Sequence, residues 1–299
     1  MIDLHIHSTA SDGFFAPKEI LKLALELQME AIALTDHDAV SGIDELKKSA
    51  KGKNIEIVNG AELSVYYPNT DMEILALDIP DNALKEFKKF QKEELKRRMK
   101  ITETRLRILN EWGYDIKFEE VAFDEKGNQR TQIRRPHFVD VLLKKGYIKT
   151  PDEAYKKIFV KRGGCFVENK PRDAKEVIEF IKDNGAVAIL AHPVHTKKVK
   201  DDLFELFKEL KGYGLDGVEV IHSSHSKGQR KSYLKMIEEL KMISAGGSDF
   251  HGGNAHPENK LGSGKNNNVR IPYFVLSELK ENRGKVVSKN YYEELLKVI

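Results

Sequence analysis

The fold is decided by the first 38 residues of the chain, MIDLHIHSTASDGFFAPKEILKLALELQMEAIALTDHD (1–38). In residues 3–7 polar and apolar side chains alternate, which predicts an extended strand with Leu4 and Ile6 facing a core. Residues 17–27 form an amphipathic pattern with proline at an early helical position, and residues 31–35 form a short apolar run. A strand, a helix and a second buried strand in this order predict the opening of an α/β fold.

The rest of the chain repeats this alternation. Helical patterns cover residues 174–184 and 202–210, and the short apolar runs around them indicate buried strands. These runs are 55–59, 72–77, 186–191, 217–221 and 242–246. Alternating strands and helices predict a largely parallel sheet or barrel, in which the carboxyl ends of the strands meet on one face.

The composition is that of a globular protein: 299 residues, 40% hydrophobic and 32% charged, are enough for a substantial core. The net charge of +3 is too small to indicate a polyanionic partner, although residues 92–107 are locally basic. The single cysteine, Cys165, excludes an internal disulfide framework and a thiolate zinc site. No run of about 18 apolar residues and no signal-peptide pattern occur, so we expect a cytoplasmic protein with no membrane partner.

One stretch breaks the alternation of strands and helices. Residues 84–112 carry a long charged helical pattern, and little strand signal follows before Gly163 and Gly164. This pattern predicts a mainly helical insertion that leaves the barrel after Pro80. We therefore expect a first part of the barrel at 1–80, a helical insertion domain at 81–162 and a second part of the barrel at 163–299.

Polar residues gather at the predicted strand ends. His5 and His7 share one face of the first strand and Asp12 follows on a turn, a spacing that favours a metal site over two isolated buried histidines. The full set is His5, His7, Asp12, His37, Glu62, His192, Asp249 and His251. Because one metal needs about four such ligands, the surplus indicates a multinuclear centre with a bridging carboxylate. We expect supporting or surface roles for the other histidines near strand ends, which are His195, His222, His225 and His256.

Five motifs in order resemble those of the PHP (polymerase and histidinol phosphatase) family: DLHIH (3–7), TDHD (35–38), GAE (60–62), AHP (191–193) and GSDFH (247–251). The resemblance implies a distorted (β/α)7 barrel of the amidohydrolase-like group, with three divalent metals. It also implies a division of the ligands, in which Glu62 is the bridge. One metal takes His5, His7, Glu62 and Asp249, a second takes Glu62 and His192, and a third takes Asp12, His37 and His251.

The chain departs from the family pattern at Glu73, where family members usually have a histidine ligand. A carboxylate coordinates the same class of metal, so we expect Glu73 to be a ligand of the second metal, with a preference for Mn²⁺ or Fe²⁺ over Zn²⁺. The alternative is an exposed glutamate at a strand edge that leaves this metal site weak or empty.

Within the insertion, RRPHF (134–138) resembles the Arg-Pro-His element of the nucleoside bisphosphate nucleotidase and exoribonuclease-like subgroup of the family. A guanidinium beside an imidazole, fixed by proline, also suits a phosphate dianion on physical grounds, so we expect Arg135 and His137 to bind substrate phosphate. The alternative is a helix start with proline in its first turn. His225 is a further candidate for phosphate contact, with a supporting role as the equal alternative.

The expected reaction is hydrolysis by a metal-activated hydroxide, with Glu62, Asp249 and His192 at the catalytic centre. The substrate is a phosphate ester, which the resemblance narrows to 3',5'-nucleoside bisphosphates or the 5' ends of short RNA. Basic side chains around Arg97 would steer such anions. Hydrolysis of histidinol phosphate, a non-catalytic module that binds a protein partner, and amide or lactone hydrolysis stay open as alternatives. We expect no obligate protein partner.

Overall fold

The computed structural model describes residues 1–68, 70–124, 127, 130, 133–160, 164–165, 167, 171–196, 202–253, 258–281 and 287–299. The strands are β1 (Ile2–Ile6), β2 (Ala31–Leu34), β3 (Glu56–Tyr67), β4 (Thr70–Leu77), β5 (Arg172–Asp173), β6 (Val187–Leu190), β7 (Gly217–His222), β8 (Ile243–Gly247), β9 (Asn259–Lys260) and β10 (Gly264–Lys265). The α-helices are α1 (Pro17–Glu26), α2 (Ile43–Ala50), α3 (Leu84–Glu111), α4 (Phe118–Ala122), α5 (Arg135–Lys144), α6 (Pro151–Glu153), α7 (Ala174–Asp183), α8 (Leu203–Gly212), α9 (Lys227–Glu239), α10 (Phe274–Glu281) and α11 (Lys289–Leu296). Short turns of 3₁₀-helix, η1 (Asp81–Ala83) and η3 (Pro193–His195), and of π-helix, η2 (Ala154–Ile158), complete the described elements.

The main sheet follows the order β1-β2-β3-β4-β6-β7-β8 and curls toward closure. Neighbouring strands run parallel except at β4, which is antiparallel to both β3 and β6. Just past the end of β8 the chain returns to β1, where Ile6 pairs with Phe250 and the amide of Asp249 donates to His5 O at 2.9 Å. The predicted α/β fold, a distorted barrel of seven strands, is confirmed, and the reversed strand β4 is its distortion.

Strand β3 is much longer than the apolar run at 55–59 predicts. Its first residues pair with β2, and from Gly60 onward it pairs with β4 in an antiparallel ladder that continues to Tyr67. Glu62 therefore lies inside a strand and not after one. The sequence signal is weak here because the second half of β3 mixes buried and exposed side chains.

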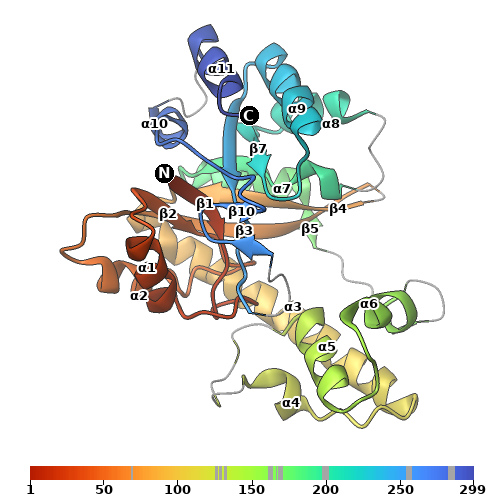
Figure 1. Cartoon of the computed structure of the whole chain (residues 1–299). Helices are drawn as coiled ribbons and strands as arrows, with labels where there is room; N and C mark the ends of the chain where they lie inside the picture. Colours follow the sequence, from red (N-terminus) through yellow and green to blue (C-terminus); the bar gives the residue numbers. More distant parts are fainter. Residues whose placement is uncertain are drawn as a thin grey trace.

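The helices that surround the barrel bury one apolar face each. In α7 the buried residues Val177 and Ile178 follow Ala174 by three and four positions and precede Ile181 by four and three, so all lie on one face. The Asp173 carboxylate caps the helix by accepting from Lys175 N. Figure 1 shows α1 and α2 beside β1 and β2, and α7 to α9 beside β6 and β7. These faces and the strands enclose one main core that includes Leu4, Ala33, Ile74, Ile189 and Val218.

The helical segment between β4 and β5 projects from one side of the barrel (Figure 1). Helix α3 joins the two regions, because Phe87 and Phe90 in its first half belong to the barrel core and Leu109 near its end belongs to a second core. That second core also contains Phe138 and Leu142 of α5. The predicted limits of the insertion at residues 81 and 162 stay a prediction, and residues 161–163 lie outside the described residues. Among the described helices none is both long and apolar enough to cross a bilayer.

Candidate metal centre

Two buried histidines lie at the carboxyl end of the first strand: His5 in β1 and His7 directly after it. The carboxylate of Asp3 accepts hydrogen bonds from Ser248 N at 2.9 Å, Ser248 Oγ at 2.5 Å and Gly262 N at 2.9 Å, which fixes β1 against the loop after β8. The approach is so close that a Cβ on Gly247 would lie 2.1 Å from His5 Cβ. Only glycine fits at position 247, and this contact brings the two ends of the chain together.

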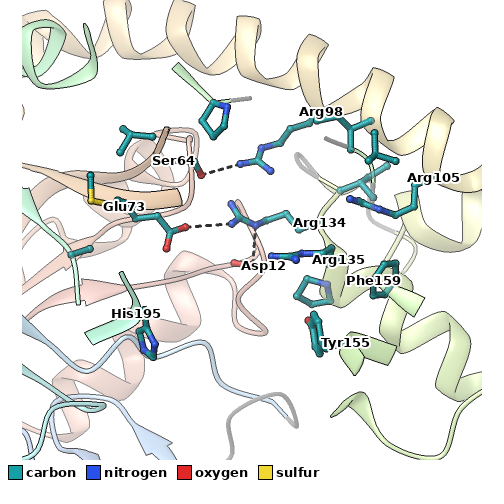
Figure 2. A pocket seen from close by; sticks show the side chains of 18 of the residues that line it. Asp12, Ser64, Glu73, Arg98, Arg105, Arg134, Arg135, Tyr155, Phe159 and His195 are labelled. Carbon is teal, nitrogen blue, oxygen red and sulfur yellow. Dashed lines mark hydrogen bonds and ion pairs between the residues drawn. The ribbon is translucent and has the colours of Figure 1, made fainter. Parts of the chain in front are cut away.

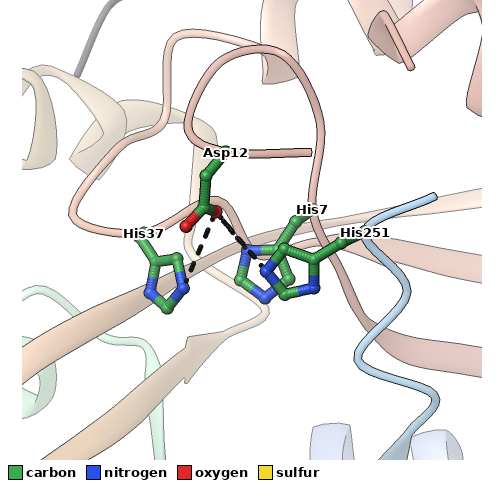
Figure 3. Close-up of side chains that lie close together, drawn as sticks. All are labelled: His7, Asp12, His37 and His251. Carbon is green, nitrogen blue, oxygen red and sulfur yellow. Dashed lines mark ion pairs between the residues drawn. The ribbon is translucent and has the colours of Figure 1, made fainter. Parts of the chain in front are cut away.

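The loop after β1 carries Asp12 into the same space. Asp36, at the end of β2, accepts from Ser8 Oγ and from Ser11 Oγ, both at 2.7 Å, and so holds the loop closed. Asp12 then faces His37 and His251, with Oδ1 3.8 Å from His37 Nε2 and 3.4 Å from His251 Nε2. Figure 3 shows one group whose potential ligand atoms lie within 4.8 Å of one another: His7, Asp12, His37 and His251.

Glu62 lies at the middle of the cluster and is fully buried. Its Oε1 is 2.9 Å from His192 Nε2 and 3.4 Å from His5 Nε2. Its Oε2 is 2.9 Å from His37 Nδ1 and 3.3 Å from His7 Nε2. One carboxylate therefore faces four imidazoles, which is the position that a bridging ligand requires.

Asp249 faces the cluster from the loop after β8. Its Oδ1 lies 3.1 Å from His7 Nε2 and 3.5 Å from His5 Nε2, and these three residues form a further potential metal group. The backbone φ of Asp249 is +57°, and that of His192 is +23°. Left-handed conformations are uncommon for residues other than glycine, so both site residues are held in costly conformations by the surrounding structure.

Glu73 reaches the cluster from β4. Its Oε1 is 3.3 Å from His37 Nδ1 and its Oε2 is 3.6 Å from His192 Nε2, and it forms a potential metal group with His37 and Glu62. The same carboxylate lies 3.6 Å from Arg134 Nη2. The carboxylate is thus beside the other candidate ligands, and its role as a ligand stays a prediction.

The nitrogen and oxygen atoms of the cluster suit divalent cations of several kinds. Among the described residues His7 Nδ1 is a buried polar atom with no hydrogen-bond partner, and Asp12 Oδ1 and Glu62 Oε2 are buried oxygens that face imidazoles. His5 Nε2 and His7 Nε2 lie 3.1 Å apart and point into the same space. Imidazole nitrogens and carboxylate oxygens that converge without thiolates are typical ligands of Mn²⁺, Fe²⁺ and Zn²⁺.

The electrostatics of the cluster favour charged carboxylates. Burial would raise the pKa of Glu62, but the imidazoles of His37 and His5 hold it well below its usual range. Burial would lower the pKa of His192, but the hydrogen bond to Glu62 and the charge of Glu73 raise it to about 9. The proton on His192 thus balances part of this buried negative charge, and a bound cation would replace it.

Two buried residues of β7, Glu219 and His222, belong to the cluster although neither was predicted as a ligand. Glu219 Oε1 lies 3.1 Å from His5 Nδ1, and Oε2 accepts from the backbone amide of His192 at 2.8 Å. His222 Nε2 is 3.7 Å from Asp249 Oδ2. Glu219 thereby orients two candidate ligands. An acidic residue inside the apolar run 217–221 is a sequence signal that could have identified it.

A cavity of about 340 Å³ extends from the cluster toward the helical segment. Its barrel side includes Asp12, Ser64, Glu73, His192 and His195, and its other side includes Arg98, Ile101, Arg105, Arg134, Arg135, Tyr155 and Phe159. Figure 2 shows that Arg134 points at the cluster. Its Nε is 3.3 Å from Asp12 Oδ2.

The three residues predicted to bind phosphate occupy different places. Arg135 lines the cavity. His137 is buried at the start of α5, where its Nδ1 accepts from Arg134 N at 3.0 Å, and His225 is buried with Nδ1 3.1 Å from Val220 O. Neither ring is among the described residues that line the cavity, and phosphate contact by His137 or His225 stays a prediction. The helix start with proline that was the alternative reading of RRPHF is present. His256 lies outside the described residues.

Comparisons with known proteins agree with this geometry. The PHP domain profile matches residues 3–246. The chain is 28% identical over 249 residues to a 5'-3' exoribonuclease of Haemophilus influenzae, covering 83% of this chain and 89% of that protein. It is 28% identical over 256 residues to a phosphoribosyl 1,2-cyclic phosphate 1,2-diphosphodiesterase of Eggerthella lenta, covering 84% and 94%.

A third relative is a 3',5'-nucleoside bisphosphate phosphatase of Chromobacterium violaceum. The two sequences are 27% identical over 257 residues, which cover 84% of this chain and 87% of that protein. Among solved structures, an amidohydrolase from Chromobacterium violaceum with bound sulfate and no metal has a TM-score of 0.76 at 24% identity, covering 93% and 95% of the two chains. That likeness shows the shared fold. Because the profile spans most of the sequence, this chain belongs to the PHP domain family.

Proposed function

We propose that this metal-dependent phosphoesterase acts on phosphate esters of nucleotides, with 3',5'-nucleoside bisphosphates or the 5' ends of short RNA as substrates. The observation that carries the proposal is the cavity, because candidate metal ligands line one side and four arginines line the other. A phosphate ester between them would meet cations on both sides. The similarity to the exoribonuclease of Haemophilus influenzae and to the nucleoside bisphosphate phosphatase of Chromobacterium violaceum supports this class of substrate.

The residues would divide the work between holding cations and holding the substrate. His5, His7, Asp12, His37, Glu62, Glu73, His192, Asp249 and His251 would hold up to three divalent cations. When bound, Mn²⁺, Fe²⁺ or Zn²⁺ supplies positive charge that lowers the pKa of water and neutralises phosphate oxygens. Glu62, Asp249 and His192 are the residues that we place at the catalytic centre.

Arg134 is the residue best placed to hold the reacting phosphate. Its planar guanidinium borders both the cluster and the cavity, so it can offer two parallel N–H donors to phosphate oxygens. Ser64, which also lines the cavity, is engaged by Asp38 Oδ2 at 3.2 Å and by Arg98 at 3.1 Å. We therefore assign Ser64 a structural role between Asp38 and Arg98, and water the role of attacking reactant.

A hydrolysis screen with added Mn²⁺ tests the proposal. The substrates are adenosine 3',5'-bisphosphate, 5'-phosphorylated oligoribonucleotides, histidinol phosphate and a 1,2-cyclic phosphate, the last because of the relative from Eggerthella lenta. We expect release of phosphate or of 5'-nucleotides from the first two, and loss of this release in His192→Ala. Faster turnover of histidinol phosphate or of the cyclic diester would replace the proposed substrate class. A His192→Ala variant as fast as the parent would remove His192 from the centre.

A further inference from the structure

The end of the cavity that lies away from the metal cluster differs from the rest in the residues that line it. Ile101 and Arg105 of α3, Ile133, and the rings of Tyr155 and Phe159 line it. Figure 2 shows Arg105 and Arg135 on this side, with Arg134 and Asp12 between them and the side chain of Glu73. This end therefore combines apolar walls with guanidinium groups.

The four arginines of the cavity differ in their partners. Arg98 pairs with Asp38 and Ser64, and Arg134 lies between Asp12 and Glu73. Within the described part of the chain, neither Arg105 nor Arg135 forms an ion pair with a carboxylate, and each contacts aromatic rings instead. The two guanidiniums near the cluster thus already face carboxylates of the protein, and among the described residues the two farther ones do not.

Arg105 is the more informative of these two residues because it is buried. Arg105 is only 7% exposed, and its guanidinium carbon lies 5.3 Å from the Phe138 ring and 5.7 Å from the Phe159 ring. Its Nε has no hydrogen-bond partner among the residues that the structure describes. Burial lowers its pKa to about 10, so it remains charged at neutral pH. Aromatic faces compensate a buried cation only in part, and an anion with acceptor oxygens would complete its surroundings.

We infer that Arg105, together with Arg135, forms a second anion subsite that receives a phosphate one nucleoside away from the phosphate that is hydrolysed. The inference rests on the proposed function and names the feature that selects its substrates. Arg98 and Arg105 are seven residues apart on α3, so they share one face of the helix and are separated by about 10 Å along its axis. The apolar surface of Ile101, Tyr155 and Phe159 lies where the sugar and base would pass.

The subsite predicts a preference for ligands with two phosphates. The second phosphate belongs either to a nucleoside bisphosphate or to the next diester of an oligonucleotide. The test includes one substrate of each kind. We compare kcat/KM for adenosine 3',5'-bisphosphate and for 5'-phosphorylated diadenylate with kcat/KM for the two adenosine monophosphates. In Arg105→Gln the ratio of double-phosphate to monophosphate kcat/KM should fall at least about tenfold, chiefly through KM, because charge-assisted hydrogen bonds are lost.

The matched control is Arg107→Gln on the same helix, where the parent side chain is exposed and pairs with Glu111. Its substrate ratio should stay within about twofold of the parent. As a readout without turnover, adenosine 3',5'-bisphosphate should raise the Tm of chelator-treated parent protein more than either monophosphate does, and this difference should shrink in Arg105→Gln. If Arg105→Gln does not fold, Arg105→Met and the Tm shifts of the parent carry the test.

The possible results distinguish a failure of the second anion subsite from a failure of the proposed function. An unchanged substrate ratio in Arg105→Gln, or a parent Tm that responds equally to one and two phosphates, would overturn the subsite. A parent enzyme that hydrolyses no nucleotide would instead overturn the proposed function. A fall in the ratio for the bisphosphate alone assigns the subsite to nucleoside bisphosphates, and a fall for the diadenylate alone assigns it to oligonucleotide ends.

Discussion

The barrel and the helical segment contribute opposite charges to one cavity. The barrel supplies the carboxylates and imidazoles of the metal cluster, and α3 with the start of α5 supplies the guanidiniums that face them. The barrel side is fixed by backbone contacts, such as the bond from Asp249 N to His5 O, whereas the helical side reaches the cluster through side chains. We infer that the barrel determines the chemistry and that the helical segment determines which phosphate ester is accepted.

Ion pairs join these two regions. Arg98 pairs with Asp38, and Arg134 pairs with Asp12 and Glu73. Asp12 and Glu73 are also candidate metal ligands, but every candidate ligand belongs to the barrel, so replacing an arginine of the helical segment leaves the ligands themselves in place. Variants on the two sides should therefore separate loss of metal from loss of substrate binding.

The largest effect is expected at the centre of the barrel, in Glu62→Gln. The amide removes the charge that faces four imidazoles, so we expect about a 1000-fold loss of kcat/KM, on the order of 4 kcal/mol in activation free energy. Elemental analysis should show a lower metal-to-protein ratio in the same variant. The control is Glu26→Gln, whose parent side chain is exposed. Full metal content with full activity in Glu62→Gln would contradict the bridging role.

The helical side is tested by comparing Arg134→Gln with Arg135→Gln. Arg134 borders the cluster and Arg135 lies over the Tyr155 ring at 6.0 Å, so we expect about a 100-fold loss of kcat/KM in the first and about a tenfold loss in the second. Both variants should keep their metal, as measured by elemental analysis. A larger loss in Arg135→Gln would restore Arg135 as the main phosphate ligand.

The sequence predicted the fold well because its signals are local. The predicted apolar runs lie within one or two residues of β2, β4, β6, β7 and β8, and the three helical patterns predicted around the barrel lie within two residues of α1, α7 and α8. The long β3 was missed because its second half mixes buried and exposed residues. For the site, the sequence predicted which residues come together. In the structure all nine candidate ligands belong to the potential metal groups.

What the sequence did not reveal depends on three-dimensional contacts. Glu219 has no motif of its own, and only its place on β7, between β6 and β8, shows that it touches His5 and His192. Arg105 is one basic residue among many in α3, and its burial between two rings depends on how α5 and η2 pack on that helix. The choice between Arg134 and Arg135 depends on side-chain direction at a helix start, which spacing does not determine.

A smaller effect is expected from Glu219→Gln. Because Glu219 orients His5 and His192 without belonging to the predicted ligands, we expect Mn²⁺ affinity to fall about 30-fold, within the range typical of residues that position metal ligands. Titration of chelator-treated protein with Mn²⁺ measures this change. Glu176→Gln on the exposed face of α7 should leave the affinity unchanged. Equal Mn²⁺ affinity in Glu219→Gln and the parent would show that the contact to His5 is dispensable.

The smallest effect concerns Cys165, which reports on the helical segment alone. The residue is fully buried in the core formed with Leu109 and Phe138, and burial raises the pKa of its thiol to about 11 even though Arg105 lies nearby. Only the thiolate reacts, so its rate with a disulfide reagent should rise about tenfold per pH unit from pH 8 to pH 10. In protein unfolded by guanidinium the rate should level off above pH 9, because an ordinary thiol has a pKa of about 8.5. Rapid labelling of the native protein at pH 7, with the metal still bound, would mean that the helical segment opens while the barrel stays closed.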